Sequence, residues 1–105
     1  MQLSLESGAN IEHPTTAHLA LIEGEEFAIL GDDPDTYLQC AKHFAVPGQY
    51  ALEYQAGSLD EHFSAVDGAV DGAVELDRVK SAFGKYLRGD SSWITDFKWE
   101  KMYLG

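Results

Sequence analysis

Cysteine and basic side chains are scarce in this sequence: among 105 residues there are one cysteine and seven lysines and arginines. The single cysteine, Cys40, excludes an internal disulfide and is typical of a protein that works in a reducing compartment. No apolar run approaches the ~18 residues that a membrane-spanning helix requires. The first six residues contain neither the basic nor the apolar stretch of a signal peptide. We therefore expect a cytoplasmic protein with no membrane partner.

Motifs that bind phosphate groups or metal ions are also missing from the sequence. It contains no Gly-x-Gly-x-x-Gly and no Gly-Lys-Ser/Thr. Cys40 and His43 are three positions apart, and on a strand such residues face opposite sides of the sheet, so they cannot bind one metal together. A calcium-binding loop that starts at Asp67 would have Arg78 in place of its glutamate ligand. The sequence therefore predicts no metal site and no cofactor.

Acidic side chains are abundant, and they are placed unevenly along the chain. Eighteen aspartates and glutamates give a net charge of −11. Residues 1–76 hold fourteen of these acids and one base, a net of −13, whereas residues 77–105 carry a net of +2. Such a field repels nucleic acid and anionic lipid and attracts a basic protein partner. Acidity also keeps proteins in solution whatever their function, and this alternative stays open.

Hydrophobic periodicity predicts a helix and then four strands in the first two thirds of the chain. The helix is expected to begin at Pro14, because the backbone N–H of a first helical residue makes no hydrogen bond within the helix and proline lacks this group. It is expected to end before Gly24. Its expected buried side consists of Ala17, His18, Leu21 and Ile22. The strands are expected at about residues 27–30, 37–41, 50–55 and 62–66, as two antiparallel hairpins.

A second helix is expected from about Glu75 to Leu87, because its apolar side chains repeat at helical spacing. This stripe consists of Leu76, Val79, Ala82, Phe83, Tyr86 and Leu87. The tandem Ala-Val-Asp-Gly over residues 65–74 is expected to form the loop before it, and Gly89 to cap its end. A short turn with Trp93 and a last strand over residues 97–104 follow.

Together these elements predict a single α+β domain over residues 1–105. We expect an antiparallel sheet of about five strands with two to three helices packed on one face. Tyr50, Leu52 and Tyr54 alternate strictly with their neighbours, so they should face the helix at 75–87.

His62 is the strongest candidate for a general base, because Asp60 and Glu61 are its neighbours in sequence. On a strand, however, Glu61 faces the side opposite to His62, and no serine or cysteine is aligned as a nucleophile. We therefore expect a protein that is not an enzyme.

The second half of the chain carries a series of apolar and aromatic landmarks. They are Tyr50-Ala-Leu-Glu53-Tyr54-Gln-x-Gly57-Ser58, His62-Phe63, Val79-x-x-Ala82-Phe83-x-x-Tyr86-Leu87 and Trp93-x-x-x-Phe97-x-Trp99-Glu100. This pattern resembles small bacterial immunity proteins of polymorphic toxin systems, in particular the family linked to deaminase toxins. The resemblance covers roughly residues 25–104 and implies a cytosolic antidote that binds and blocks a cognate toxin. Toxins of this kind are often basic, which suits an acidic inhibitor.

On this hypothesis the chain neutralises a toxin domain by occluding its active surface, with acidic groups that pair with basic ones and an exposed aromatic as anchor. The expected binding residues are Asp32, Asp33, Asp35, Glu53, Asp60, Glu61, Tyr54 and Trp93. One alternative is a homodimer, or larger homo-oligomeric module, that pairs through the strand near Tyr37 or through the terminal strand. Another is a small-molecule-binding domain or minor enzyme with a pocket between the helix at 75–87 and the sheet.

Overall fold

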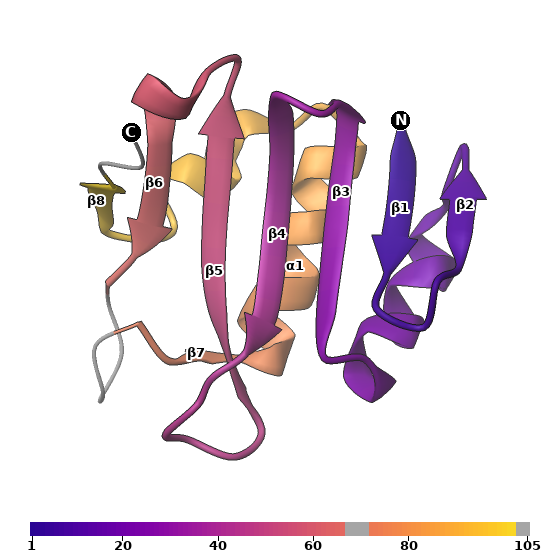
Figure 1. The fold of residues 1–105 in the computed structure, drawn as a ribbon, viewed down its shortest axis with the longest axis horizontal. Coiled ribbons are helices and arrows are strands. Elements are labelled where there is room, and N and C mark those ends of the chain that lie inside the picture. Colours follow the sequence, from indigo (N-terminus) through magenta and orange to yellow (C-terminus); the bar gives the residue numbers. More distant parts are fainter. Residues whose placement is uncertain (67–71, 103–105) are drawn as a thin grey trace.

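A computed structural model describes residues 1–66 and 72–102 as an antiparallel sheet with helices behind it (Figure 1). Two helices are substantial: η1 (Thr16–Gly24), a 3₁₀ helix, and α1 (Leu76–Leu87). Two short 3₁₀ turns are η2 (Leu59–Glu61) and η3 (Ser91–Ile94). The strands are β1 (Gln2–Leu5), β2 (Asn10–Glu12), β3 (Phe27–Asp33), β4 (Thr36–Lys42), β5 (Gln49–Ala56), β6 (His62–Ala65), β7 (Val74–Glu75) and β8 (Trp99–Met102).

The eight strands follow the order β2-β1-β3-β4-β5-β6-β8, and β7 pairs with the start of β5. The predicted α+β class, the antiparallel sheet and the helices on one face are confirmed, but the number of about five strands is wrong. β1, β2 and β7 account for the difference. These strands have two to four residues, and their backbone is held by pairing with neighbouring strands that lie far away in the sequence or beyond a turn.

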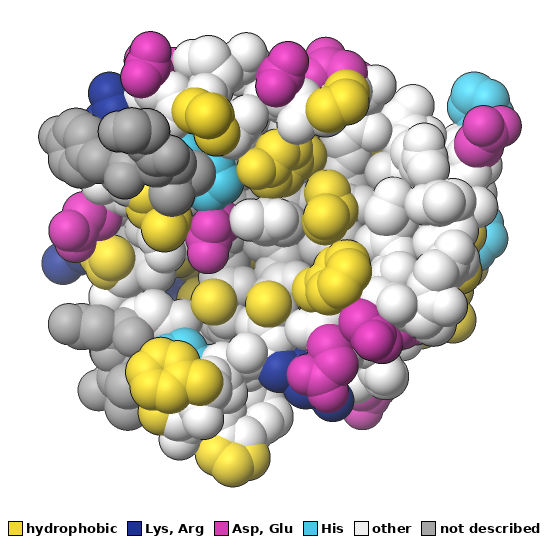
Figure 2. All heavy atoms as spheres, in the orientation of Figure 1, with side chains coloured by type: hydrophobic (Ala, Val, Ile, Leu, Met, Phe, Trp, Pro, Cys, Tyr) yellow, Lys and Arg dark blue, Asp and Glu magenta, His cyan; other side chains and the backbone are white. Residues whose placement is uncertain are grey.

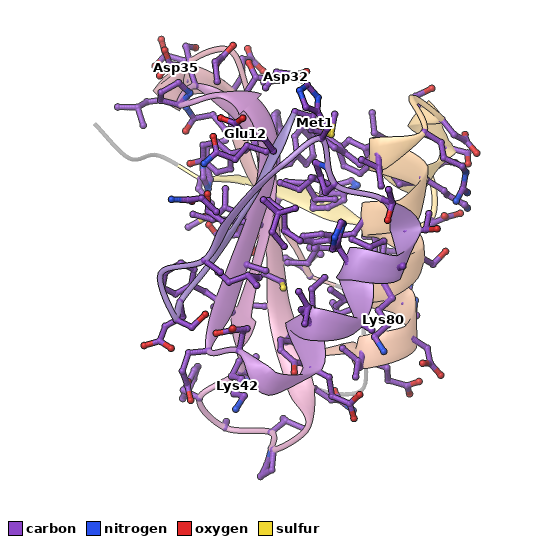
Figure 3. The ribbon with its side chains drawn as sticks, turned by 90° about the vertical axis from the view of Figure 1, so that its right-hand side faces the viewer. Met1, Glu12, Asp32, Asp35, Lys42 and Lys80 are labelled. Carbon is purple, nitrogen blue, oxygen red and sulfur yellow. The ribbon has the colours of Figure 1, made fainter. Side chains whose placement is uncertain are left out.

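One face of the sheet packs against the helices and forms the core. Alternation directs Leu30 of β3, Leu38 of β4 and Leu52 of β5 to this face, and all three are fully buried. Phe83 of α1 packs in the same core and is also fully buried, as its position in the predicted apolar stripe requires. Figure 3 shows the helix layer on one side of the sheet only.

The first helix differs from the prediction in its type and its buried side. It is a 3₁₀ helix of nine residues, so side chains three positions apart lie on the same side. Leu19 and Ile22 have that spacing and are buried, whereas Leu21 is 47 % exposed and Ala17 is exposed. The buried side expected from a 3.6-residue period is therefore wrong for Ala17 and Leu21.

The end of the chain closes against β6. The predicted turn is η3, where the Asp90 side chain accepts from the Ser92 N–H at 3.0 Å. The predicted terminal strand is observed as Trp99–Met102, and its last expected residues lie outside the described part of the chain. The predicted loop over residues 65–74 also lies largely outside it, because residues 67–71 are not described.

Cys40 lies in the core, on the helix-facing side of β4. Its side chain is buried, and burial raises the pKa of the thiol to about 12, although a hydrogen bond from the Ala28 backbone acts in the opposite direction. A buried, protonated thiol is a packing group rather than a nucleophile.

A tight backbone contact at Gly31 gives the first test of the fold. A Cβ atom there would lie 2.4 Å from the Thr36 carbonyl oxygen and 2.7 Å from Tyr37 Cβ, so Gly31→Ala must displace β4. We expect it to lower the free energy of unfolding by about 1–3 kcal/mol. Gly24→Ala is the matched control, because nothing lies within 4 Å of its added Cβ, and it should change stability by less than about 1 kcal/mol. Urea unfolding of both variants measures the difference, and equal midpoints would contradict this register.

Candidate functional site

The sheet face opposite the helices forms the candidate site, and we call it the uncovered face. Each described helix of substantial length packs on the other side (Figures 1 and 3). Figure 2 has the orientation of Figure 1, in which α1 lies behind the sheet, so it shows the uncovered face. Alternation and register place on this face Gln2, Ser4, Phe27, Ile29, Gly31, Tyr37, Gln39, Ala41, Ala51, Glu53, Gln55, His62 and Ser64.

An apolar row crosses the uncovered face. Phe27, Ala41 and Ala51 are cross-strand partners on β3, β4 and β5, and Ile29 follows Phe27 on the same face. Phe27 is 39 % exposed, and Figure 2 shows hydrophobic side chains gathered over the middle of this face. Apolar surface left in contact with water by a folded chain commonly marks an interaction site.

The loop between β4 and β5 carries a second exposed apolar group at the edge of this face. The Phe44 side chain is 97 % exposed, and its ring stacks on His43 with centroids 4.8 Å apart. The His43 ring is fixed in turn, because its Nδ1 accepts from the Ala45 N–H at 3.1 Å. An aromatic ring held in this way loses little conformational entropy when a partner covers it.

A network of polar side chains centred on His62 occupies the other half of the face. His62 is only 2 % exposed; its Nδ1 lies 3.0 Å from Gln55 Oε1, and its Nε2 lies 2.7 Å from Glu53 Oε1. Gln55 Nε2 donates to the Asp35 carbonyl at 3.1 Å, which fixes the orientation of its amide. Both ring nitrogens therefore face acceptor oxygens. Because the Gln55 amide oxygen can only accept, Nδ1 is the donor of that pair.

Tyr37 and Gln39 extend the network onto β4. The Tyr37 hydroxyl donates to Gln55 Oε1 at 3.2 Å, and Gln39 Nε2 donates to Glu53 Oε1 at 3.2 Å. Burial raises the pKa of the Tyr37 phenol, and the charges of Glu53 and Asp35 raise it further, so the phenol remains a donor at neutral pH. A buried network whose members are hydrogen-bonded to one another holds its side chains in one arrangement.

The partner of His62 is therefore Glu53 and not Glu61 or Asp60, its neighbours in sequence. The hairpin register explains this, because Gln55 lies opposite His62 and Glu53 lies opposite Ser64, all on one face. Glu61 is exposed and lies in η2, before the strand begins, so the alternation expected of it as a strand residue does not apply. The alternation of the sequence predicts which side chains share a face with His62. It does not predict the pairing register that brings Glu53 to His62.

Five of the six predicted acidic residues lie together at one end of the sheet, which we call the acidic end. Asp32 and Asp33 end β3, Asp35 follows in the turn between β3 and β4, and Asp60 and Glu61 belong to η2. All five are exposed. The two turns are joined by a hydrogen bond from the Gly57 N–H to the Asp35 carbonyl at 2.9 Å. Figure 2 shows acidic side chains along this end.

The basic side chains of α1 belong to the opposite layer. They are Arg78, Lys80, Lys85 and Arg88. Figure 3 shows Lys80 on the helix layer and Asp32 and Asp35 at the acidic end of the sheet. Lys42, on β4, forms an ion pair with Glu26 at 3.5 Å. The asymmetry of charge along the sequence thus becomes an asymmetry between an acidic end of the sheet and a basic helix.

The two predicted aromatic residues lie on the helix-facing side of the sheet, away from the uncovered face. The Tyr54 ring packs edge-on against Trp93 at 5.0 Å and Trp99 at 4.7 Å. Trp93 is 6 % exposed, so it offers little surface to a partner. Burial and then the charge of Glu61 raise the pKa of Tyr54. The exposed aromatic side chains that sequence reasoning missed are Phe27 and Phe44; alternation with the buried Ala28 would have identified Phe27.

Two of the alternatives change once the topology is known. The strand near Tyr37 is β4, which pairs with β3 and β5 on its two sides, so the predicted homodimer through that strand is wrong. β8 lies at an end of the strand order and keeps the terminal-strand form of that alternative open. The other alternative places a small-molecule pocket between α1 and the sheet. That space is filled by Val79, Ala82 and Phe83, which are all fully buried.

Within residues 1–66 and 72–102, no group of three or more histidine, cysteine, aspartate or glutamate side chains has the proximity that a metal ion requires. Asp67, the start of the rejected calcium loop, lies outside these residues. In the same part of the chain, every helix is too short or too polar to cross a bilayer. Comparisons with protein-family models, with curated proteins and with solved structures find no match for this chain.

The contact between His62 and Glu53 can be tested by two substitutions of similar size. Glu53→Gln keeps the network satisfied, because its amide can donate to a neutral His62 Nε2 and accept from Gln39. Glu53→Leu leaves both partners without an acceptor, so we expect it to lower the free energy of unfolding by about 1–3 kcal/mol, and Glu53→Gln by less than about 1 kcal/mol. Urea unfolding measures both, and long-range ¹H–¹⁵N spectra should show a protonated Nδ1. Equal losses, or an unprotonated Nδ1, would contradict the network.

Proposed function

We propose that this protein binds a basic protein partner on its uncovered face, and that it is an immunity protein that neutralises a cognate toxin by occluding the toxin's active surface. One observation carries the proposal: the sheet face that the helices leave bare carries an exposed apolar row, and the strands that carry this row lead to the acidic end. The resemblance of the aromatic and apolar landmarks to deaminase-toxin immunity proteins supports the more specific part.

The composition of the face supports binding because protein interfaces combine an apolar centre with a polar rim. Phe27 and Ile29 supply the centre, and Phe44 projects at its edge. Such anchors contribute most of the binding free energy when a partner excludes water from them. The face therefore offers both a hydrophobic contact and charged groups around it.

The acidic end supports a basic partner. Five exposed carboxylates in two joined turns produce a local negative potential, and the basic side chains of α1 lie on the other layer. Such a field accelerates association with a basic protein and slows it with an acidic one. A toxin that acts on nucleic acid needs a basic active surface to hold its substrate, and such a surface is complementary to this end.

Binding is favoured over catalysis by the state of His62. Both of its ring nitrogens lie within hydrogen-bond distance of protein oxygens, and its side chain is almost fully buried. A general base must come within hydrogen-bond reach of a substrate proton. His62 instead fixes the side chains around it.

The proposed attraction between the acidic end and a basic partner predicts a change in association rate. A triple variant removes three negative charges from the acidic end through Asp32→Asn, Asp33→Asn and Asp35→Asn. Their control is Glu23→Gln, Glu75→Gln and Asp77→Asn, which removes three charges from the helix layer and the segment leading into it. Against the cognate toxin domain that the proposal requires, we expect the first triple variant to associate about tenfold more slowly at 50 mM salt, with most of the difference gone at 500 mM. Stopped-flow fluorescence measures the rates. Equal rates for the two triple variants would rule out steering by the acidic end.

The proposal that this chain neutralises a toxin predicts that it rescues the growth of cells that express the toxin. Cells that express the cognate toxin domain should stop growing, and co-expression of this chain should restore growth. Phe27→Asp with Phe44→Asp should abolish rescue, because the substitutions put charge into the apolar contact. The control Leu21→Asp, on an exposed residue of η1, should rescue fully. Rescue by all variants would contradict binding through the uncovered face, and a dimer by light scattering that forms no complex with the toxin would favour pairing through β8.

A further inference from the structure

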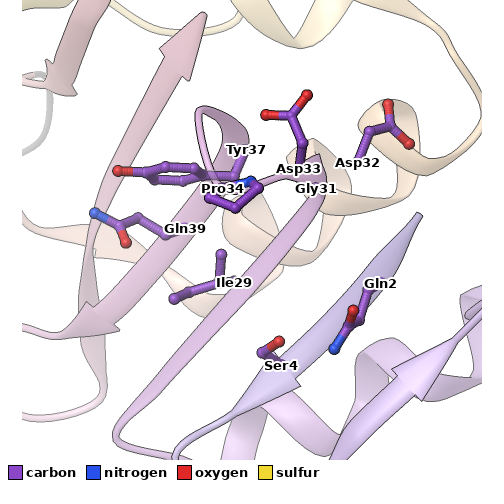
Figure 4. A pocket seen from close by; sticks show the side chains of 9 residues that line it. All are labelled: Gln2, Ser4, Ile29, Gly31, Asp32, Asp33, Pro34, Tyr37 and Gln39. Atoms are coloured by element: carbon purple, nitrogen blue, oxygen red, sulfur yellow. The ribbon is translucent and has the colours of Figure 1, made fainter. Parts of the chain in front are cut away.

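A hollow of about 430 Å³ opens on the uncovered face between β1, β3 and the β3–β4 turn (Figure 4). Its walls include Ile29 and the Tyr37 ring, and Asp32 and Asp33 border it at the acidic end. The hollow therefore joins the apolar part of the face to the charged part.

The backbone of β3 creates this hollow. Gly31 has no side chain to fill it, and the contact of 2.4 Å that a Cβ would make with the Thr36 carbonyl prevents any other residue from doing so. The register shifts between Gly31 and Asp33, so the strand bends where the hollow opens. A hollow enforced by backbone geometry persists in the free protein.

The walls of the hollow are also fixed in position. The Tyr37 hydroxyl is bound to Gln55 and the Gln39 amide to Glu53, the two side chains that also hold His62. Asp33 Oδ1 accepts from the Asp35 N–H at 2.8 Å, which orients its carboxylate. A site whose walls do not need to be ordered on binding loses less free energy when a ligand enters.

We propose that the hollow receives an arginine side chain of the partner, an inference that rests on the proposed function because the partner supplies the arginine. The aliphatic part of arginine packs on Ile29, its guanidinium lies against the face of the Tyr37 ring, and Asp32 and Asp33 accept its N–H groups. Arginine fits better than lysine because its planar head both stacks on an aromatic ring and binds carboxylates through two parallel hydrogen bonds.

The test uses N-acetyl-arginine amide as the probe and follows backbone amide signals by NMR. We expect the signals of Gly31, Asp32 and Tyr37 to shift with half-saturation at millimolar probe, and N-acetyl-citrulline amide, which has the same shape without the charge, to bind at least about tenfold more weakly. Asp32→Asn with Asp33→Asn should weaken the arginine probe about tenfold. The control Asp60→Asn with Glu61→Gln removes the same charge at the same end of the sheet and should leave its binding unchanged.

Equal binding of the arginine and citrulline probes, equal binding of N-acetyl-lysine amide, or equal losses in the two double variants would overturn the assignment. The outcome is separate from that of the proposed function. A toxin complex with no binding of the arginine probe would reject the hollow alone. Binding of the probe by a chain that forms no toxin complex would support the hollow and reject the proposed function.

Discussion

The structure depends on one constraint: within residues 1–66 and 72–102, the helices cover only one face of a wide sheet. Alternation along β3, β4 and β5 sends leucines to the helix side, where Phe83 of α1 completes a dry core. The opposite face must then be stable in contact with water. It has a short apolar row and a set of polar side chains that satisfy one another, and these two features make it a candidate binding surface.

The His62 network shows how polar side chains on the sheet face opposite the helices hold one another in place. Glu53, Gln55 and His62 come from two neighbouring strands, and Tyr37 and Gln39 from a third, so the network ties three strands together through side chains. Buried ionic groups often add little net stability, but they restrict the arrangements that their neighbours can adopt. The positions of the Tyr37 ring and the Gln39 amide, which border the hollow, follow from this restriction.

Predictions from the sequence were correct where they depended on a regular spacing of apolar side chains within one helix or strand. The stripe of α1 repeats at helical spacing, and Tyr50 and Leu52 alternate strictly, so both buried faces were predicted correctly. The predictions failed where long-range pairing decides the structure. β1 and β7 are strands because their neighbours pair with them, and the 3₁₀ geometry of η1 turns Leu21 outwards.

The same distinction between local sequence patterns and long-range pairing applies to the candidate site. The acidic residues of the two turns were identified from composition, and the hairpin topology places Asp35 and Gly57 in direct contact. Glu53 was expected among them, but register assigns it to His62. Trp93 was expected as an anchor because of its residue type, and the ring cluster with Tyr54 buries it instead. Residue type alone does not distinguish a core aromatic from an interface aromatic.

The central claim is that a partner covers the uncovered face. Hydroxyl-radical footprinting of the chain, free and in complex with the partner that the proposal requires, tests it directly, because side chains that lose contact with water become less oxidised. The account predicts protection of Phe27, Tyr37 and Phe44 and unchanged oxidation of Leu21 and Ile94, which are exposed outside this face. Protection of Leu21 or Ile94 with Phe27 and Phe44 unchanged would place the partner elsewhere and contradict the account.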